Sequence, residues 1–231
     1  MTDASTAGHP EALVIVAAFE EGAVIGDVVA DLRQHFQNVL LVDDGSSDDT
    51  GPSAALAGAI VIRHSVNLGQ GAALETGIMY GLRLPGIQRF VTFDADGQHR
   101  PEDAVRLVQR LEGSGADLVL GSRFLGEGAA HIPRFRRAVL RVARWYVTRS
   151  SGLDLTDAHN GLRAFGRRAA QGFRFKHPGM AHASEVTDIA GHQGWSVVEE
   201  PVTIRYTEYS LSKGQSLLNA INISFDLFWR R

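Results

Sequence analysis

The chain has 231 residues, 44% of them hydrophobic and 21% charged, which provides enough apolar surface for a buried core and excludes an intrinsically disordered chain. Cysteine is absent, so disulfides, thiol nucleophiles and cysteine-ligated metal centres are excluded. The net charge of −3 conceals two unlike halves. Residues 1–115 hold 16 acidic and 7 basic residues, and residues 116–231 hold 10 acidic and 16 basic residues. This asymmetry suggests carboxylates that hold a metal in one half and cations that meet an anion in the other.

Short apolar runs alternate with helical patterns along the first half of the chain. Strands are expected at residues 13–18, 39–42, 59–63, 90–93 and 118–120, and helices at residues 24–36, 72–84 and 101–111, with a further short helix before residue 59. This alternation predicts βαβ units and a largely parallel sheet. Ligands bind beyond the carboxyl ends of the strands in such sheets, and the residues suited to chemistry follow the first, second, fourth and fifth runs.

The second half is less regular and carries the remaining expected elements. Helices are expected at residues 132–148, 183–192 and 215–229, and strands at residues 162–165 and 197–202. We predict one α/β domain over residues 11–214, with a mostly parallel, Rossmann-like sheet flanked by helices. A flexible tail at residues 1–10 precedes it, and an amphipathic helix at residues 215–231 follows it. We expect no signal peptide and no membrane-spanning helix, which would need ~20 apolar residues in a row.

Two carboxylates, Asp94 and Asp96, follow the fourth expected strand. Both can reach one point because the glycine after them permits a sharp turn. Carboxylate oxygens suit Mg²⁺ or Mn²⁺, with phosphates completing the coordination, and Gln98 offers a further carbonyl oxygen. The alternative is an acidic turn that caps the helix beginning at Pro101. The position at a strand end, together with a second acidic turn elsewhere, favours the metal site.

That second acidic turn, residues 43–50, follows the second expected strand. A carboxylate there, Asp43 or Asp44, can accept hydrogen bonds from a nucleobase or ribose. Ordinary turn and N-cap chemistry is the alternative for part of this segment. A glycine-rich segment at residues 67–71 precedes a helix, so its backbone amides can face a nucleotide, although a plain loop is favoured for this segment taken alone.

Basic side chains gather on one face of the expected helix at residues 132–148. They recur at steps of three and four residues and are Arg134, Arg137, Arg141 and Arg144. A solvated surface helix is the ordinary explanation. Nucleic acid is disfavoured because the whole chain is acidic and carries no recognition motif, and an anionic lipid headgroup or lipid phosphate fits better. The apolar face of the helix at residues 215–229 suits either core packing or the membrane interface.

Taken in order, these segments resemble the family-2 glycosyltransferases of the GT-A fold, and within them the dolichyl- or polyprenyl-phosphate sugar synthases. The resemblance rests on six motifs, at residues 18–21, 42–48, 67–72, 94–99, 121–124 and 160–165. Each motif is weak alone, and the six in order are strong evidence. The chain departs from the family pattern at Ala18, Leu140 and Asn160, where Pro, Ser, and Ser or Cys are usual.

The resemblance implies a role for particular residues of these motifs. The residues expected to bind the nucleotide are Ala18, Phe19, Glu20, Asp43, Asp44, Asn67, Gly71 and Asp94. The residues expected to hold Mg²⁺ or Mn²⁺ on the diphosphate are Asp94, Asp96 and Gln98. The residues expected to act in catalysis, including arginines that hold the acceptor phosphate, are Asp96, Arg123, Arg137 and Arg163.

The expected activity is inverting sugar transfer from a GDP- or UDP-linked sugar to a polyprenyl phosphate, by a protein peripheral to the cytoplasmic face of the membrane. A phosphate acceptor is already ionised, whereas a hydroxyl acceptor needs a general base, for which Asp157 and Glu185 are the candidates. Two alternatives stay open. One is a transferase that builds cell-surface polysaccharide on a carbohydrate acceptor, and the other is a non-catalytic nucleotide-sugar-binding partner of a membrane protein. A separate small membrane protein is a further candidate partner.

Overall fold

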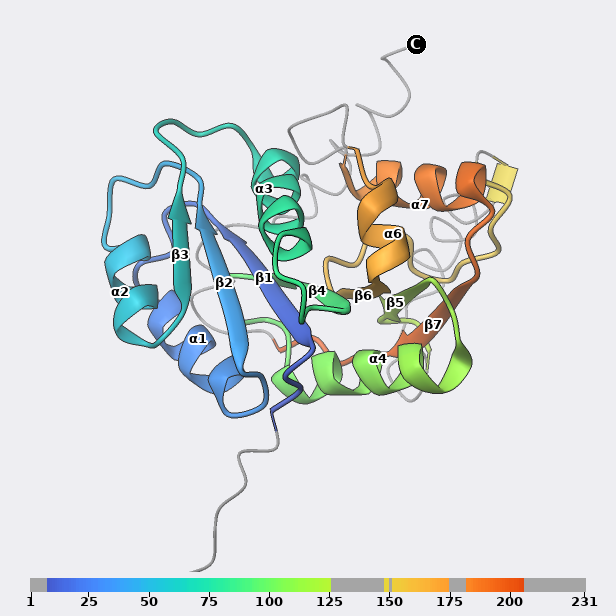
Figure 1. Cartoon of the computed structure of the whole chain (residues 1–231), viewed down its shortest axis with the longest axis horizontal. Helices are drawn as coiled ribbons and strands as arrows, with labels where there is room; N and C mark the ends of the chain where they lie inside the picture. Colours follow the sequence, from blue (N-terminus) through green and yellow to red (C-terminus); the bar gives the residue numbers. More distant parts are fainter. Residues whose placement is uncertain (1–7, 126–147, 150, 175–181, 206–231) are drawn as a thin grey trace, which may run out of the picture.

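Figure 1 shows the computed structural model of the chain, which describes residues 8–125, 148–149, 151–174 and 182–205. The expected basic helix, up to residue 147, lies outside the described residues, and Arg137 with it. The expected C-terminal helix and most of the expected N-terminal tail also lie outside them.

Within the described residues, seven strands form one sheet in the order β3-β2-β1-β4-β6-β5-β7. The strands are β1 (Ala12–Ala18), β2 (Asn38–Asp43), β3 (Ile60–Arg63), β4 (Arg89–Asp94), β5 (Leu118–Ser122), β6 (Arg163–Gly166) and β7 (Val197–Pro201). Neighbouring strands are parallel except at β6, which runs antiparallel to both β4 and β5. The prediction of a mostly parallel α/β sheet is confirmed.

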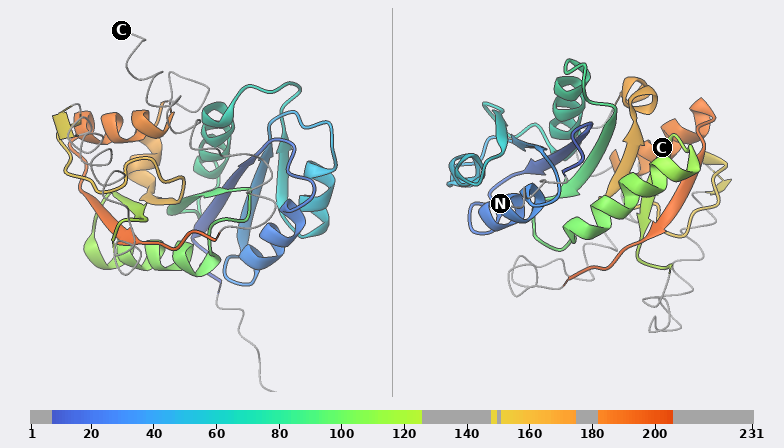
Figure 2. Two further views of the ribbon diagram at one scale, coloured as in Figure 1. Left: turned by 180° about the vertical axis from the view of Figure 1, so that it is seen from behind. Right: turned by 60° about the horizontal axis from the view of Figure 1, so that its bottom comes forward.

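Helices cover both faces of the sheet, as the two views of Figure 2 show. They are α1 (Ile25–Arg33), α2 (Thr50–Leu56), α3 (Gln70–Leu82), α4 (Pro101–Ser114), α6 (Arg167–Gly172) and α7 (His182–Gln193). The core on one face is built with α1, α2 and α4, and the core on the other with α3, α6 and α7. None of the helices in the described part of the chain is long and apolar enough to cross a membrane.

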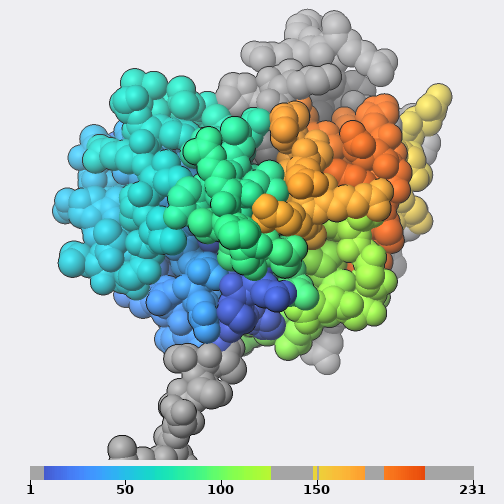
Figure 3. Space-filling view, in the orientation of Figure 1, coloured from blue at the N-terminus to red at the C-terminus, as the bar shows by residue number. Residues whose placement is uncertain are grey.

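The strand β1 shows why the sequence forms this sheet. All seven of its residues are buried, and they alternate between the two cores: Val14 and Val16 face one, and Leu13 and Ile15 the other. A strand covered on both faces needs a continuous apolar run, which is the pattern at residues 12–18. The surface view shows the elements of the second half packed directly against α3 and α4, so the described residues form one continuous body (Figure 3).

Helix boundaries differ from the expected ones by a few residues. The helix α4 continues to Ser114, three residues past the expected end, because Gly115 adopts the left-handed conformation (φ 66°) that ends the helix there. The helix α3 begins at Gln70, two residues early, directly after Gly69 with φ 97°. The sequence pattern predicted a strand at residues 162–165 but not its antiparallel place between β4 and β5, which depends on pairing partners far along the chain.

Candidate active site

The carboxyl ends of the central strands bring most of the expected nucleotide and metal residues to one edge of the sheet. In the strand register, Ala18 pairs with Asp43 of β2, and Ala17 pairs with Asp94 of β4. The backbone N–H of Asp44 then donates to the carbonyl of Ala18 (2.8 Å). Three motifs separated by about 25 to 50 residues in the sequence therefore start from neighbouring points, as parallel strands with right-handed crossovers require.

The loop after β1 is held by the acidic turn after β2. Glu20 has a positive φ of 56°, which is uncommon for a residue other than glycine. Its N–H donates to Ser46 Oγ (2.9 Å), and its carboxylate accepts from Ser47 Oγ (2.7 Å). Phe19 beside it is 43% exposed. The two serines of the acidic turn thus fix the backbone that presents an aromatic ring to solvent.

The first two carboxylates of the acidic turn, Asp43 and Asp44, are buried and engaged within the protein. Asp43 accepts from the N–H of Ser46 (2.9 Å). Asp44 accepts from the N–H groups of Leu68 (2.9 Å) and Gly69 (2.7 Å), and it lies 2.7 Å from Nδ1 of His64. Asp44 is 3% exposed. The carboxylate expected to bind the nucleotide therefore holds the glycine-rich segment in place.

His64 is a site residue that the sequence did not indicate. Its Nδ1 contacts Asp44, and its Nε2 lies 3.0 Å from Oγ1 of Thr76 on α3. The imidazole thus links the acidic turn to the helix that follows the glycine-rich segment, where Gly71 is buried and Asn67 is exposed. A histidine just after an edge strand gives no signal in the sequence, because both of its partners are more than ten residues away.

Asp94 and Asp96 lie together at the end of β4 with the character of a cation site. Burial and the charge of Asp94 raise the pKa of Asp96, and they outweigh the opposing hydrogen bond from the N–H of Gln98 (3.0 Å). Asp94 is oriented from behind by His99, whose Nε2 lies 2.9 Å from its Oδ2. Two crowded carboxylates that resist ionisation together are stabilised by a nearby cation. His99 is itself buried, so it positions Asp94.

The donor set fits Mg²⁺ or Mn²⁺ shared with a diphosphate. Within the described residues, no group of three or more His, Asp or Glu is arranged to hold a metal ion by itself. Mg²⁺ is usually held by one or two carboxylates together with substrate phosphates and water, which is what Asp94 and Asp96 offer. The backbone carbonyl of Gln98, the third expected ligand, accepts from the N–H of Arg205 (2.9 Å), which leaves the side-chain amide as the group to test.

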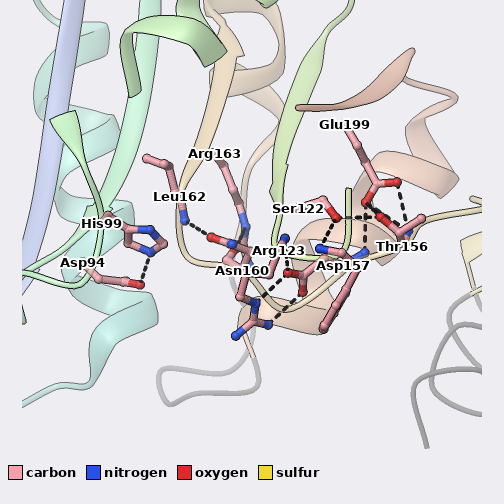
Figure 4. A network of polar contacts seen from close by, with 11 residues as sticks. Asp94, His99, Ser122, Arg123, Thr156, Asp157, Asn160, Leu162, Arg163 and Glu199 are labelled. Carbon is pink, nitrogen blue, oxygen red and sulfur yellow. Dashed lines mark hydrogen bonds and ion pairs between the residues drawn. The ribbon is translucent and has the colours of Figure 1, made fainter. Parts of the chain in front are cut away.

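A second polar cluster lies at the end of β5, as Figure 4 shows. Asp157 accepts from Nε (2.7 Å), Nη2 (2.8 Å) and the backbone N–H (3.1 Å) of Arg123. Burial alone would raise the pKa of Asp157, but the hydrogen bonds and charge of Arg123 outweigh it and the pKa is lowered. The Arg123 side chain is 40% exposed while that of Asp157 is 2% exposed. A buried carboxylate therefore fixes a guanidinium that reaches solvent.

Arg163 lies in the interior between the two clusters. It is 2% exposed, and its Nε donates to the carbonyl of Asn160 (2.9 Å). Burial lowers the pKa of Arg163 to about 10, although the charges of Asp94 and Asp157 oppose that shift. Among the described residues, neither Arg163 Nη2 nor Asn160 Nδ2 has a hydrogen-bond partner. The side chain expected to act on substrate is thus a buried cation that links the two carboxylates electrostatically.

Comparisons with known proteins agree with this arrangement. The family model described as "Glycosyl transferase family 2" matches residues 13–173. A UDP-N-acetylglucosamine–dolichyl-phosphate N-acetylglucosaminyltransferase of Methanococcus voltae is 30% identical over 240 residues, covering 94% of this chain and 93% of that protein. A polyprenol monophosphomannose synthase of Mycolicibacterium smegmatis is 34% identical over 215 residues, covering 87% of this chain and 80% of that protein.

Among solved structures, the fold is similar to that of glucosyl-3-phosphoglycerate synthase from Mycobacterium tuberculosis, determined in complex with Mn²⁺ and UDP-glucose. The TM-score is 0.67 at 20% sequence identity, covering 95% of this chain and 77% of that chain. At this identity the likeness concerns the fold.

Proposed function

The chain belongs to glycosyl transferase family 2 and has the GT-A fold, and from this premise we propose that it transfers a sugar from a nucleotide diphosphate sugar to a polyprenyl phosphate. The transfer inverts the anomeric carbon. The observation that carries the choice of acceptor is the Arg123–Asp157 pair at the end of β5. A guanidinium fixed by a buried carboxylate is suited to holding phosphate oxygens in one orientation. Both relatives named above are described as acting in dolichyl-phosphate or polyprenol-phosphate chemistry.

The donor side is built from the ends of β1, β2 and β4. Phe19 and Glu20 follow β1, and Glu20 is held by the acidic turn after β2. Asp44 of that turn holds the segment at residues 67–69, and Asp94 at the end of β4 completes this row of residues. This row offers the nucleotide an aromatic face, and the diphosphate would lie next to Asp94 and Asp96. Mg²⁺ or Mn²⁺ held by Asp94, Asp96 and Gln98 would neutralise charge on the leaving diphosphate.

The acceptor side explains why no strong base is needed. A phosphate monoester is ionised at neutral pH, so its oxygen attacks the anomeric carbon directly as the bond to the nucleoside diphosphate breaks. Asp157, one of the two base candidates for a hydroxyl acceptor, has a lowered pKa because Arg123 holds it ionised. A carboxylate in that state is a weak base. This favours the phosphate acceptor over the carbohydrate acceptor, for which Glu185 on α7 is the other base candidate.

The location we propose is peripheral to the cytoplasmic face of the membrane, where a polyprenyl phosphate presents its headgroup. The support comes from the sequence, which predicts four arginines on one face of an expected helix and an amphipathic helix at residues 215–231. The four arginines and the C-terminal segment lie outside the described residues. Basic side chains meet anionic headgroups, and apolar area rests in the interface. A separate small membrane protein is a further partner to test.

A donor and acceptor panel tests the proposal. The full chain is incubated with UDP- and GDP-linked sugars, with Mg²⁺ or Mn²⁺, and with or without polyprenyl phosphate, and both nucleoside diphosphate release and lipid-linked sugar are measured. We expect lipid-linked sugar to form with one donor in a metal-dependent reaction. Transfer to an oligosaccharide acceptor, with none to polyprenyl phosphate, would contradict the proposed acceptor.

A further inference from the structure

Glu199 of β7 is a charged strand residue with no role in the site described so far. It stands opposite Leu120 of β5 in the strand register. Its carboxylate accepts from the backbone N–H of Thr156 (2.9 and 3.0 Å), from Thr156 Oγ1 (2.9 Å) and from the backbone N–H of Asp157 (2.9 Å). One carboxylate thus satisfies two consecutive backbone donors and a hydroxyl. It fixes the turn that carries Asp157.

A hydroxyl pair ties the same turn to β5. Ser122 Oγ lies 2.6 Å from Thr156 Oγ1, and it also accepts from the N–H of Phe124 (3.2 Å). Ser122 is fully buried and immediately precedes Arg123. The turn at residues 156–157 is therefore held from two strands, by Glu199 of β7 and by Ser122 of β5, on the side where Asp157 meets the guanidinium (Figure 4).

We propose that Glu199 is a positioning residue of the transfer reaction, acting through Asp157 on the guanidinium of Arg123. It is not expected to touch either substrate. Its effect is to keep the Asp157 carboxylate where it can accept from both Nε and Nη2, so the guanidinium is oriented before the acceptor arrives. This inference rests on the proposed function, in which Arg123 holds the acceptor phosphate.

Preorganisation gives the expected size of the effect. An arginine that must be ordered during binding weakens affinity by about tenfold relative to one already held in place. In Glu199→Gln the amide oxygen can replace Oε1, which accepts from Thr156 and Asp157, but an NH2 group replaces Oε2 and faces the backbone N–H of Thr156, donor against donor. The turn is therefore held less firmly and has more than one arrangement. The expected effect is weaker binding of the acceptor. The donor residues after β1, β2 and β4 do not contact this turn through any hydrogen bond described above.

The test is Glu199→Gln in the full chain, with polyprenyl phosphate as acceptor and the nucleotide sugar identified by the panel. We expect the KM for the acceptor to rise about tenfold while the KM for the donor stays within about twofold. Glu200→Gln is the matched control, because Glu200 is the next residue of β7 and pairs instead with Arg106 (3.7 Å). That variant should leave both KM values unchanged.

A double-substitution cycle separates positioning from a purely structural role. If Glu199 acts through Arg123, adding Glu199→Gln to Arg123→Gln should produce no further loss of acceptor affinity, because the interaction it supports is already gone. Additive losses, or an equal rise in the KM for donor and acceptor, would overturn the proposal. The same cycle is run with whichever acceptor the wild-type protein uses. If the wild-type protein turns over only a carbohydrate acceptor, the proposed function is contradicted. The double-substitution cycle with that carbohydrate still shows whether Glu199 acts through Arg123.

A second pair of variants covers the case in which Glu199→Gln does not fold. Thr156→Val removes the hydroxyl shared by Glu199 and Ser122 but keeps the backbone N–H and the shape, whereas Thr156→Ser keeps the hydroxyl. The valine variant should raise the KM for the acceptor, and the serine variant should resemble the wild type. Equal KM values for the acceptor in the two folded variants would contradict the proposal that Glu199 positions Arg123 through this turn.

Discussion

Gly161 lies directly against the carboxylate of Asp94, so that a β-carbon added at Gly161 would overlap both carboxylate oxygens. The glycine is held there because its carbonyl accepts from Thr92 Oγ1 (2.7 Å) on β4. The loop before β6 therefore sets how far the Asp94 carboxylate can swing. A residue outside the acidic motif limits the geometry of the motif.

Gly161→Ala should therefore displace Asp94 and reduce metal-dependent binding of the nucleoside diphosphate by at least about tenfold, the loss of roughly one charge-assisted interaction. Calorimetric titration of the nucleoside diphosphate in Mn²⁺ measures this. The control is Gly166→Ala at the end of β6, where a β-carbon would meet nothing within 4 Å. Equal affinities in the two variants would show that the Asp94 carboxylate has room to move.

Asp96→Asn should abolish transfer without lowering the stability of the ligand-free protein. Burial and the Asp94 charge raise the pKa of Asp96, so the folded pKa lies above the unfolded one. The ionised carboxylate therefore costs stability at neutral pH. The variant should unfold in chelator at the same temperature as the wild type or slightly higher. Wild-type activity should also vanish in excess chelator, and full activity there would rule out the metal site.

Asp44→Ala should weaken both nucleotide binding and the fold. From the sequence, Asp44 is expected only to bind the nucleotide. The structure buries it against two backbone N–H groups and His64, so its removal should cost about 3 kcal/mol of unfolding free energy. Urea unfolding measures this, with Asp49→Ala as control for an exposed carboxylate of the same turn. Equal midpoints would contradict the bracing role.

The stability provided by the Arg123–Asp157 pair should disappear in acid. The pKa of Asp157 is lowered in the folded state, so its contribution is fully present above the unfolded pKa and is lost as pH falls through the folded pKa. The unfolding free energy of the wild type should exceed that of Asp157→Asn by a constant amount from pH 8 to about pH 5. The difference should narrow below about pH 4. Urea titrations at several pH values test this, and a difference that grows in acid would contradict it.

Replacing Arg137 and Arg141 by Gln should reduce binding to anionic liposomes and transfer to polyprenyl phosphate, while binding of the nucleotide sugar survives. The charges act through water, so binding should also weaken as salt is added. Sedimentation with anionic vesicles at low and high salt measures this. If the wild-type protein stays in the supernatant at low salt, the basic face is an ordinary solvated surface.

Strand positions and the pair of carboxylates after β4 could be predicted from the sequence because their signals are local. The strand β1 is a continuous apolar run, and Asp94 and Asp96 stand directly at the end of another. His64 and Glu199 could not be identified, since a single polar residue beside or within a strand acquires its partners only after distant segments pack. The burial of Arg163 could not be predicted either, because an arginine in a sequence suggests a surface position. Arg163 is interior because β6, which begins at this residue, pairs with both β4 and β5.

The antiparallel insertion of β6 also has a consequence for synthesis. Residues 163–166 complete the sheet by pairing with β4 and β5, so a nascent chain that has reached only residue 125 carries two apolar strands whose edges have no neighbour between them. Unpaired strand edges of this kind promote aggregation. Slow codons placed between β5 and β6 should prolong the exposure of these edges and lower the soluble yield of the protein.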